Sequence, residues 1–181
     1  MNSKEDVFDY QILNLTDKFY YDYPNPPYKE LLKKNDRPYN CLLLQSHYGY
    51  FICIPYRSNI QHKFAFKFKN SERSKRAKSG LDYSKMVIIK NKEYIGKQDA
   101  VVDKDEYIET KNNIEYIKSD AQKYIDDYVN YLSGKAVKFT SREFERIYRY
   151  STLRYFHKEL EIERLADRDL QDTGLRRRKS R

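Results

Sequence analysis

Short apolar runs and apolar–polar alternation dominate the first half of the chain. Both patterns are typical of strands, because successive side chains of a strand point to opposite faces of a sheet. The pattern predicts five strands, at residues 7–14, 38–46, 50–55, 62–69 and 84–90. Gly49 between the second and third indicates a hairpin loop.

Two of these segments also predict which sides of the strand are buried. Residues 41–44 (CLLL) are continuously apolar, so both faces of that strand should be covered. In residues 62–69 (HKFAFKFK), phenylalanines occupy every second position and lysines most of the positions between them. One face of this strand should pack on the core while the other carries positive charge.

A helical period replaces the strand pattern in the second half. Residues 114–132 carry apolar side chains at a spacing close to 3.6, and Gly134 is placed to end that helix. A shorter helix is predicted at residues 15–23, before a proline-rich segment. Residues 70–80 are polar and rich in small residues, which predicts a loop.

Two capping-box spacings predict where further helices begin. Asp103 with Glu106 and Thr140 with Glu143 both place an acidic residue three positions after an N-cap residue. The second helix should continue to Phe156. The elements together predict an α+β fold, with a strongly twisted, mostly antiparallel sheet of about five strands flanked by helices.

Residues 1–162 are predicted to form a single domain. Residues 163–181, which end in RRRKSR, have no apolar face to bury. They are predicted to be a basic tail, either disordered or an artificial extension.

Composition indicates a folded protein with an acidic partner. The 19 tyrosines and 9 phenylalanines among 181 residues supply apolar area for a core. The net charge of +9 favours a nucleic acid as partner, with an anionic membrane surface as the alternative. The chain has no apolar run long enough to span a bilayer and no signal peptide, which predicts a cytoplasmic protein without membrane contact. Cys41 and Cys53 lie in apolar runs and should be buried, reduced thiols.

Several kinds of site are excluded by the motifs that the sequence lacks. The five glycines are scattered, so no phosphate-binding glycine loop is formed, and the cysteines and histidines do not have the spacing of a zinc cluster. We therefore expect no metal and no cofactor, and a nuclease of this sequence should work without metal.

Candidate chemistry is concentrated in residues 57–63. Arg57, Ser58, His62 and Lys63 could together cleave RNA by attack of a 2′-hydroxyl, which needs a base, an acid and cations that stabilise the phosphorane. The products would be a 2′,3′-cyclic phosphate and a 5′-hydroxyl. Histidine exchanges protons near neutral pH, so His62 is a candidate base or acid. The alternative is that these residues form an ordinary solvated loop.

A basic stretch follows and is the predicted track for an RNA backbone. Its cations are Lys67, Lys69, Arg73, Lys75, Arg76 and Lys78.

The segment after the basic stretch could close the site. The backbone at Ser79 and Gly80 could bind a phosphate, Lys85 adds a further cation for RNA, and Asp82 could orient Arg57 or His62, or instead only cap a turn. The aromatic residues beside these motifs, Tyr56 and Tyr83, are predicted to stack on unpaired bases.

The motifs PYRSNIQHKFAFKFK, SGLDYSKMVII and RYSTLRYFHKELEI, at residues 55–69, 79–89 and 149–162, resemble the toxin protein of type III toxin–antitoxin systems. The chain is similar to the ToxN/AbiQ class and closest to its CptN/TenpN branch. The resemblance implies a MazF/Kid-like sheet and a metal-independent endoribonuclease active in phage defence. It also implies inhibition by a small pseudoknot RNA, which the toxin processes from a repeat transcript and with which it forms a closed RNA–protein assembly.

This sequence departs from the ToxN motif at two positions. Ser58 matches the motif serine, but Arg57 stands in place of a threonine and Ile60 in place of a lysine. The cationic role must therefore pass to Arg57 or Lys63. A non-catalytic RNA-binding module is the alternative to an endoribonuclease. A DNA-binding helical repressor is less favoured, since the positive charge lies in the β half.

Overall fold

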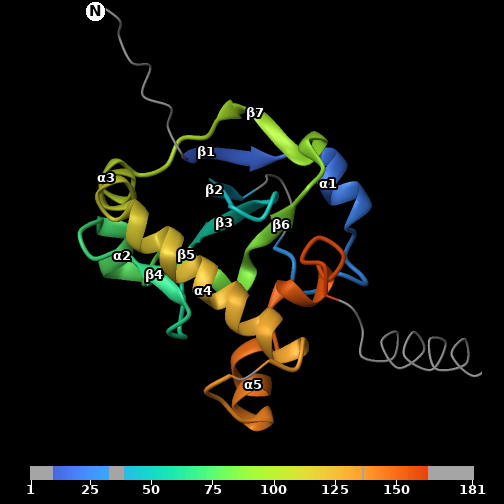
Figure 1. The fold of residues 1–181 in the computed structure, drawn as a ribbon. Helices are drawn as coiled ribbons and strands as arrows, with labels where there is room; N and C mark the ends of the chain where they lie inside the picture. Colours follow the sequence, from blue (N-terminus) through green and yellow to red (C-terminus); the bar gives the residue numbers. More distant parts are fainter. Residues whose placement is uncertain (1–9, 33–38, 136, 163–181) are drawn as a thin grey trace, which may run out of the picture.

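The computed structural model describes residues 10–32, 39–135 and 137–162. It confirms the α+β class, with an open antiparallel sheet and helices against it (Figure 1). The sheet has seven strands rather than about five, in the order β4-β5-β3-β2-β1-β7, with β6 also paired to β3. The strands are β1 (Tyr10–Leu15), β2 (Asn40–Gln45), β3 (Phe51–Arg57), β4 (Ala65–Lys67), β5 (Gly80–Asp82), β6 (Val87–Ile89) and β7 (Ile95–Asp99).

The predicted hairpin of β2 and β3 is confirmed and lies at the centre of the sheet. Its register pairs Cys41 with Pro55 and Leu44 with Ile52. All four residues from Cys41 to Leu44 are buried, as their continuous apolar run predicts. β1 covers the other edge of β2. The centre of the sheet is therefore buried on both faces.

The second edge of β3 is shared by two short strands. β6 pairs with the start of β3, from Phe51 to Cys53, and β5 pairs with its end, at Tyr56 and Arg57. Between β5 and β6 the chain makes a single 3₁₀ turn, η1 (Tyr83–Lys85). This interruption falls opposite Pro55, and proline is tolerated in sheets at such irregular positions. The turn brings the segment from Asp82 to Lys85 beside the end of β3.

The helices are α1 (Asp17–Asp22), α2 (Glu72–Ala77), α3 (Lys104–Asn112), α4 (Ile114–Leu132) and α5 (Ser141–Tyr148), with 3₁₀ turns η2 (Lys92–Tyr94) and η3 (Thr152–Tyr155). α4 crosses one face of the sheet, and α5 lies beyond the C-terminal end of α4 (Figure 1). The ring of Tyr124 on α4 packs in a tilted arrangement against that of Tyr148 on α5, with 4.7 Å between ring centroids. The predicted helix at residues 114–132 is therefore confirmed.

Some predicted elements are wrong or incomplete. The helix that begins after the Thr140–Glu143 capping box ends at Tyr148 instead of Phe156. The predicted loop at residues 70–80 contains α2, and the predicted strand at residues 84–90 is reduced to β6 after η1. β5 and β7 are strands that the sequence pattern did not predict. These strands of three and five residues depend on pairing with distant segments, because such short runs show no reliable period.

Parts of several predictions lie outside the described residues, namely the start of the first strand at residues 7–9 and the tail at residues 163–181. Cys41 and Cys53 are buried and free, as predicted. Within the described part of the chain, no helix combines the length and apolar character needed to cross a membrane.

Candidate functional site

A buried carboxylate at the end of β5 organises the candidate site. The Asp82 side chain is 0% exposed. It accepts a hydrogen bond from Nη1 of Arg57, and its Oδ1 lies 3.3 Å from Nε2 of His62. It also accepts hydrogen bonds from the backbone N and the hydroxyl of Ser84, at 2.9 and 2.7 Å. The prediction that Asp82 orients Arg57 or His62 is confirmed for both, and Asp82 caps the η1 turn as well.

These contacts hold Asp82 in its charged form. Burial acts to raise the pKa of this carboxyl group, but hydrogen bonds from His62 and Ser84 and the charges of His62 and Arg57 outweigh burial. The net effect is a lowered pKa. The buried carboxylate therefore stays negatively charged beside Arg57 and His62.

His62 lies at the edge of this cluster and is partly exposed. Its ring stacks on Phe64 at 6.1 Å between centroids, and its Nε2 is also 3.3 Å from the Ser84 hydroxyl. Its Nδ1 is buried and has no hydrogen-bond partner among the described residues. The ring therefore presents Nε2 to Asp82, and a substrate can reach Nδ1 only after the ring turns.

Lys85 lies near the same site. From the sequence it was predicted only as a cation that binds RNA. Its Nζ donates a hydrogen bond to the Tyr150 carbonyl oxygen at 2.7 Å. Burial lowers its pKa, and the positive charges of Arg57 and Arg154 add to this effect, whereas Asp82 raises it. The structure thus joins Arg57 and His62 to Asp82 directly, and Lys85 lies close enough for the charges of Arg57 and Asp82 to act on its pKa. A lysine whose ammonium form is disfavoured is suited to accept a proton.

Two of the four predicted catalytic residues are not joined to this cluster. The Ser58 hydroxyl accepts a hydrogen bond at 3.0 Å from Nε of Arg73. The Lys63 ammonium lies 5.6 Å from the centroid of the Phe64 ring. Neither residue has a described contact with Asp82. The backbone explains the position of Ser58, because Asn59 and Ile60 donate hydrogen bonds to the carbonyls of Ala77 and Lys78 and hold this loop against α2.

The basic stretch is held to the domain by two glutamates of α3. Glu109 accepts hydrogen bonds from the backbone N–H groups of Lys69 and Asn70. Glu106 is buried and accepts hydrogen bonds from Ser71 and Ser79. The Asp103–Glu106 pair is therefore not a reciprocal capping box: Asp103 caps α3, but the Glu106 side chain binds the basic stretch.

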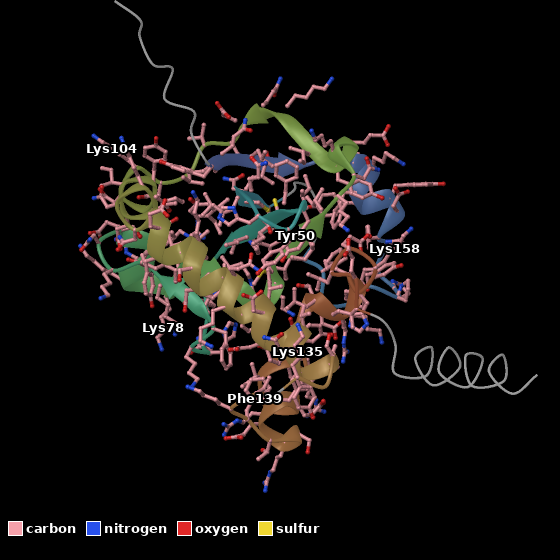
Figure 2. All side chains as sticks on the ribbon, in the orientation of Figure 1. Tyr50, Lys78, Lys104, Lys135, Phe139 and Lys158 are labelled. Carbon is pink, nitrogen blue, oxygen red and sulfur yellow. The ribbon has the colours of Figure 1, made fainter. Side chains whose placement is uncertain are left out.

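Most cations of the predicted RNA track are accessible. Lys69, Lys75, Arg76 and Lys78 are exposed, while Lys67 and Arg73 are partly buried. Lys78, in the left-handed conformation, ends α2 and projects from the surface beside β4 (Figure 2). Arg73 is partly neutralised by Glu106, at 3.6 Å, and Lys75 by Glu72, at 2.9 Å. The strongest candidates for phosphate contacts are therefore Lys69, Arg76 and Lys78.

Three of the predicted RNA-binding residues have buried side chains. Tyr56 is 3% exposed, stacks on Phe68 and shares a hydrogen bond with Thr110. Tyr83 is 2% exposed and points into the protein. Ser79 is 0% exposed, and its hydroxyl is used by Glu106. None of these side chains is accessible on the outer surface to an RNA base or phosphate.

The close pairing of β4 and β5, rather than phosphate binding, explains why a glycine stands at position 80. A Cβ at this position would lie 2.3 Å from the carbonyl oxygen of Phe66 in β4. The glycine therefore allows β4 and β5 to pair closely and so fixes Asp82 at the end of β5.

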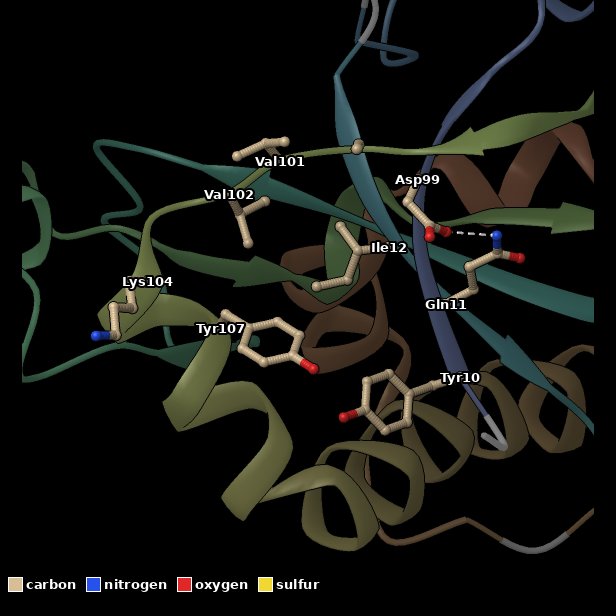
Figure 3. A pocket seen from close by; sticks show the side chains of 9 residues that line it. Tyr10, Gln11, Ile12, Asp99, Val101, Val102, Lys104 and Tyr107 are labelled. Carbon is tan, nitrogen blue, oxygen red and sulfur yellow. Dashed lines mark hydrogen bonds between the residues drawn. The ribbon is translucent and has the colours of Figure 1, made fainter. Parts of the chain in front are cut away.

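A separate cavity of about 600 Å³ lies between β1, the segment after β7 and α3 (Figure 3). Tyr10 and Tyr107 face each other across it, and Gln11 donates a hydrogen bond to Asp99 at 2.7 Å. Its lining includes none of the predicted site residues.

Comparison of the chain with known protein families, curated proteins and solved structures found no match. The likeness to type III toxins and to the MazF/Kid sheet therefore stays a prediction. Among the described residues, no group of three or more histidine, cysteine or acidic side chains is arranged to hold a metal ion.

Proposed function

We propose that the protein is a metal-independent endoribonuclease. The observation that carries this proposal is the contact of Arg57 and His62 with the buried carboxylate of Asp82, with Lys85 near enough for the same charge to act on its pKa. Two proton-transfer groups and a permanent cation lie next to an accessible basic surface. This is the set of groups that transesterification of RNA needs.

The geometry supports a division of roles. Lys85, whose lowered pKa favours the neutral amine, takes the proton of the 2′-hydroxyl as that oxygen attacks the phosphorus. Arg57 stabilises the added negative charge of the phosphorane. Protonated His62, once its ring has turned Nδ1 toward the substrate, donates its proton to the leaving 5′-oxygen. The products are a 2′,3′-cyclic phosphate and a 5′-hydroxyl, and exchange of protons with solvent restores both groups.

The toxin assignment extends this proposal and depends on the sequence resemblance. In that reading the protein acts in the cytoplasm on cellular or phage RNA. A pseudoknot RNA that the protein itself processes covers the basic surface and restrains cleavage within a closed RNA–protein assembly. The exposed positions of Lys69, Arg76 and Lys78 suit contact with a folded RNA backbone.

A non-catalytic RNA-binding module is the second candidate. The observation in its favour is that His62 Nδ1 is buried and that Ser58 is bound to Arg73, so two predicted catalytic groups are not presented to a substrate. Binding without cleavage would identify this alternative.

Histidine substitutions test the proposal. We expect His62→Ala to lower the single-turnover rate of cleavage of single-stranded RNA by about 10²–10⁴-fold. His47→Ala is the matched control, because His47 is exposed in the β2–β3 loop. Equal rates for His62→Ala and the unmodified protein would remove His62 from the mechanism. Tight RNA binding by the unmodified protein without any cleavage would replace the enzyme with the binding module.

A further inference from the structure

A second cavity lies directly beside the Asp82 site. Its volume is about 330 Å³, which is within the range of roughly 300–1,000 Å³ that is usual for small-molecule sites. Its walls come from the residues just before β4, from η1 and α4, and from α5 with the segment that precedes it. They include the rings of Phe64, Tyr83, Tyr124, Phe139 and Tyr148. Phe139 marks the α5 end of this region in Figure 2.

One covalent neighbour, one ring contact and one electrostatic effect connect the cavity to the candidate site. Tyr83 follows Asp82 in the chain, and the Phe64 ring stacks on His62. Phe64 in turn lies 5.9 Å from Tyr124 between ring centroids. Burial raises the pKa of Tyr124, and the charge of Asp82 adds to this shift, so the hydroxyl lies within reach of the Asp82 field. A group bound in the cavity would thus adjoin a phosphate held at the site.

Two buried hydroxyl groups in the cavity wall lack partners. The Tyr83 and Tyr124 side chains are 2% and 6% exposed, and neither hydroxyl has a partner at full hydrogen-bond geometry, although Asp120 lies near the first and Ser151 near the second. Buried polar groups without partners are uncommon in native proteins, because they have lost their bonds to water. The nearest polar neighbours of these two hydroxyls are thus Asp120 and Ser151.

A carboxylate completes the cavity. Asp120 projects from α4 into the lining close to Tyr83, whose pKa is raised first by burial and then by the Asp120 charge. A second carboxylate in the lining, Asp127, is paired with Lys123 at 2.5 Å. Asp120 is therefore the carboxylate best placed to accept hydrogen bonds from a ligand.

We infer that this cavity binds the nucleobase next to the scissile phosphate and prefers guanine, an inference that rests on the proposed function. Aromatic walls suit the stacking of any base. An ionised carboxylate only accepts hydrogen bonds, so it selects a base edge that carries donors. Guanine offers two adjacent donor groups, N1–H and N2–H₂. Uracil offers one N–H between two carbonyl oxygens, which a carboxylate repels.

Mononucleotide binding to the full chain, measured by isothermal titration calorimetry, tests this inference. We expect 5′-GMP to bind about tenfold or more tightly than 5′-UMP. Inosine monophosphate, which lacks the N2 amino group, should lie between them. Asp120→Asn should remove the preference. Asp126→Asn is the matched control, because Asp126 lies on α4 but bonds Gln122 and does not line this cavity.

The outcomes distinguish a failure of the cavity inference from a failure of the proposed function. Equal binding of GMP and UMP, or an unchanged preference in Asp120→Asn, would overturn the inference, as would cleavage beside all four bases at equal rates. A GMP preference that depends on Asp120, in a protein that cleaves no RNA, would uphold the cavity and reject the proposed function.

Discussion

The Arg57 guanidinium donates a hydrogen bond through Nη1 to Oδ2 of Asp82, although the two residues are 25 positions apart in the sequence. The Arg57 side chain is 25% exposed, whereas the Asp82 side chain is fully buried. Asp82 is therefore positioned to serve other protein groups rather than a substrate. Arg57 retains donors that can face a phosphate, because its guanidinium carries five N–H groups.

Asp82→Asn tests this organising role through stability. The variant keeps the shape of the side chain but leaves Arg57 without its counter-charge, so we expect the free energy of unfolding at pH 7 to fall by about 2 kcal/mol. Urea denaturation measures the change. Asp105→Asn, at an exposed position of α3, is the control and should stay within about 0.5 kcal/mol.

The stability of the unmodified protein and that of Asp82→Asn should respond differently to acid. The pKa of Asp82 in the folded protein is below its ordinary value of 3.8, so its stabilising effect is complete above that value. The effect is lost as the pH falls through the lowered pKa. Acidification should therefore reduce the difference in the free energy of unfolding between the unmodified protein and Asp82→Asn. A difference that does not change with pH would show that the charge of Asp82 does not stabilise the fold.

Lys85→Arg tests the assignment of the general base. Arginine keeps the positive charge but does not deprotonate, so we expect cleavage to slow by about 10²-fold or more. In the unmodified protein the rate should rise with pH as Lys85 loses its proton, below 10.5, the ordinary pKa of lysine, because the pKa of Lys85 is lowered. The rate should fall again at the pH where the general acid has lost its proton, so the profile is bell-shaped. A pH–rate profile measures both effects. An identical profile in Lys85→Arg would move the role of the base to another group.

Lys85→Met separates catalysis from stability. A lysine with a lowered pKa is destabilising while it is charged in the folded protein, and this cost is relieved as the pH rises through the lowered pKa. Lys85→Met should consequently lose cleavage without losing stability at pH 7. Loss of both together would indicate a structural role for Lys85 instead.

The accessible cations of the basic stretch should make RNA binding strongly dependent on salt. With six to ten phosphate contacts, affinity should fall about 10³–10⁵-fold between 50 and 200 mM salt. Arg76→Ala should lower the slope of log affinity against log salt by about 0.7, the value for one contact to a single strand. Lys18→Ala on α1, a cation outside the basic stretch, should leave the slope unchanged. A weak slope in the unmodified protein would contradict the RNA track.

The elements whose apolar pattern repeats over many residues, or whose local signals are strong, were predictable from the sequence. The β2–β3 hairpin has two apolar runs around Gly49, and α4 repeats its apolar face over 19 residues. β5 and β7 were not predictable, because each is set by pairing with a distant strand. The end of α5 was missed because the chain after Tyr148 retains apolar residues, which pack in the η3 turn instead of a longer helix.

The candidate site was partly predictable. Arg57, His62 and Asp82 could be named from their residue types and meet as expected. The directions of Ser58 and Lys63 depend on the loop between them, where Asn59 has a φ of 59° and Ile60 is 1% exposed. No residue pattern reports such loop geometry. The role of Lys85 depends on burial beside Arg57 and Arg154, which only the tertiary structure shows.

The ends of the RNA products test the central claim most directly. Purified protein is incubated with end-labelled single-stranded RNA in excess EDTA, and the fragments are treated with phosphatase and with polynucleotide kinase to identify their termini. Attack by the 2′-hydroxyl at the Asp82 site predicts cleavage in EDTA, with 2′,3′-cyclic phosphate and 5′-hydroxyl ends and with a large loss of rate in His62→Ala. Intact RNA, or fragments that end in a 3′-hydroxyl, would contradict the account.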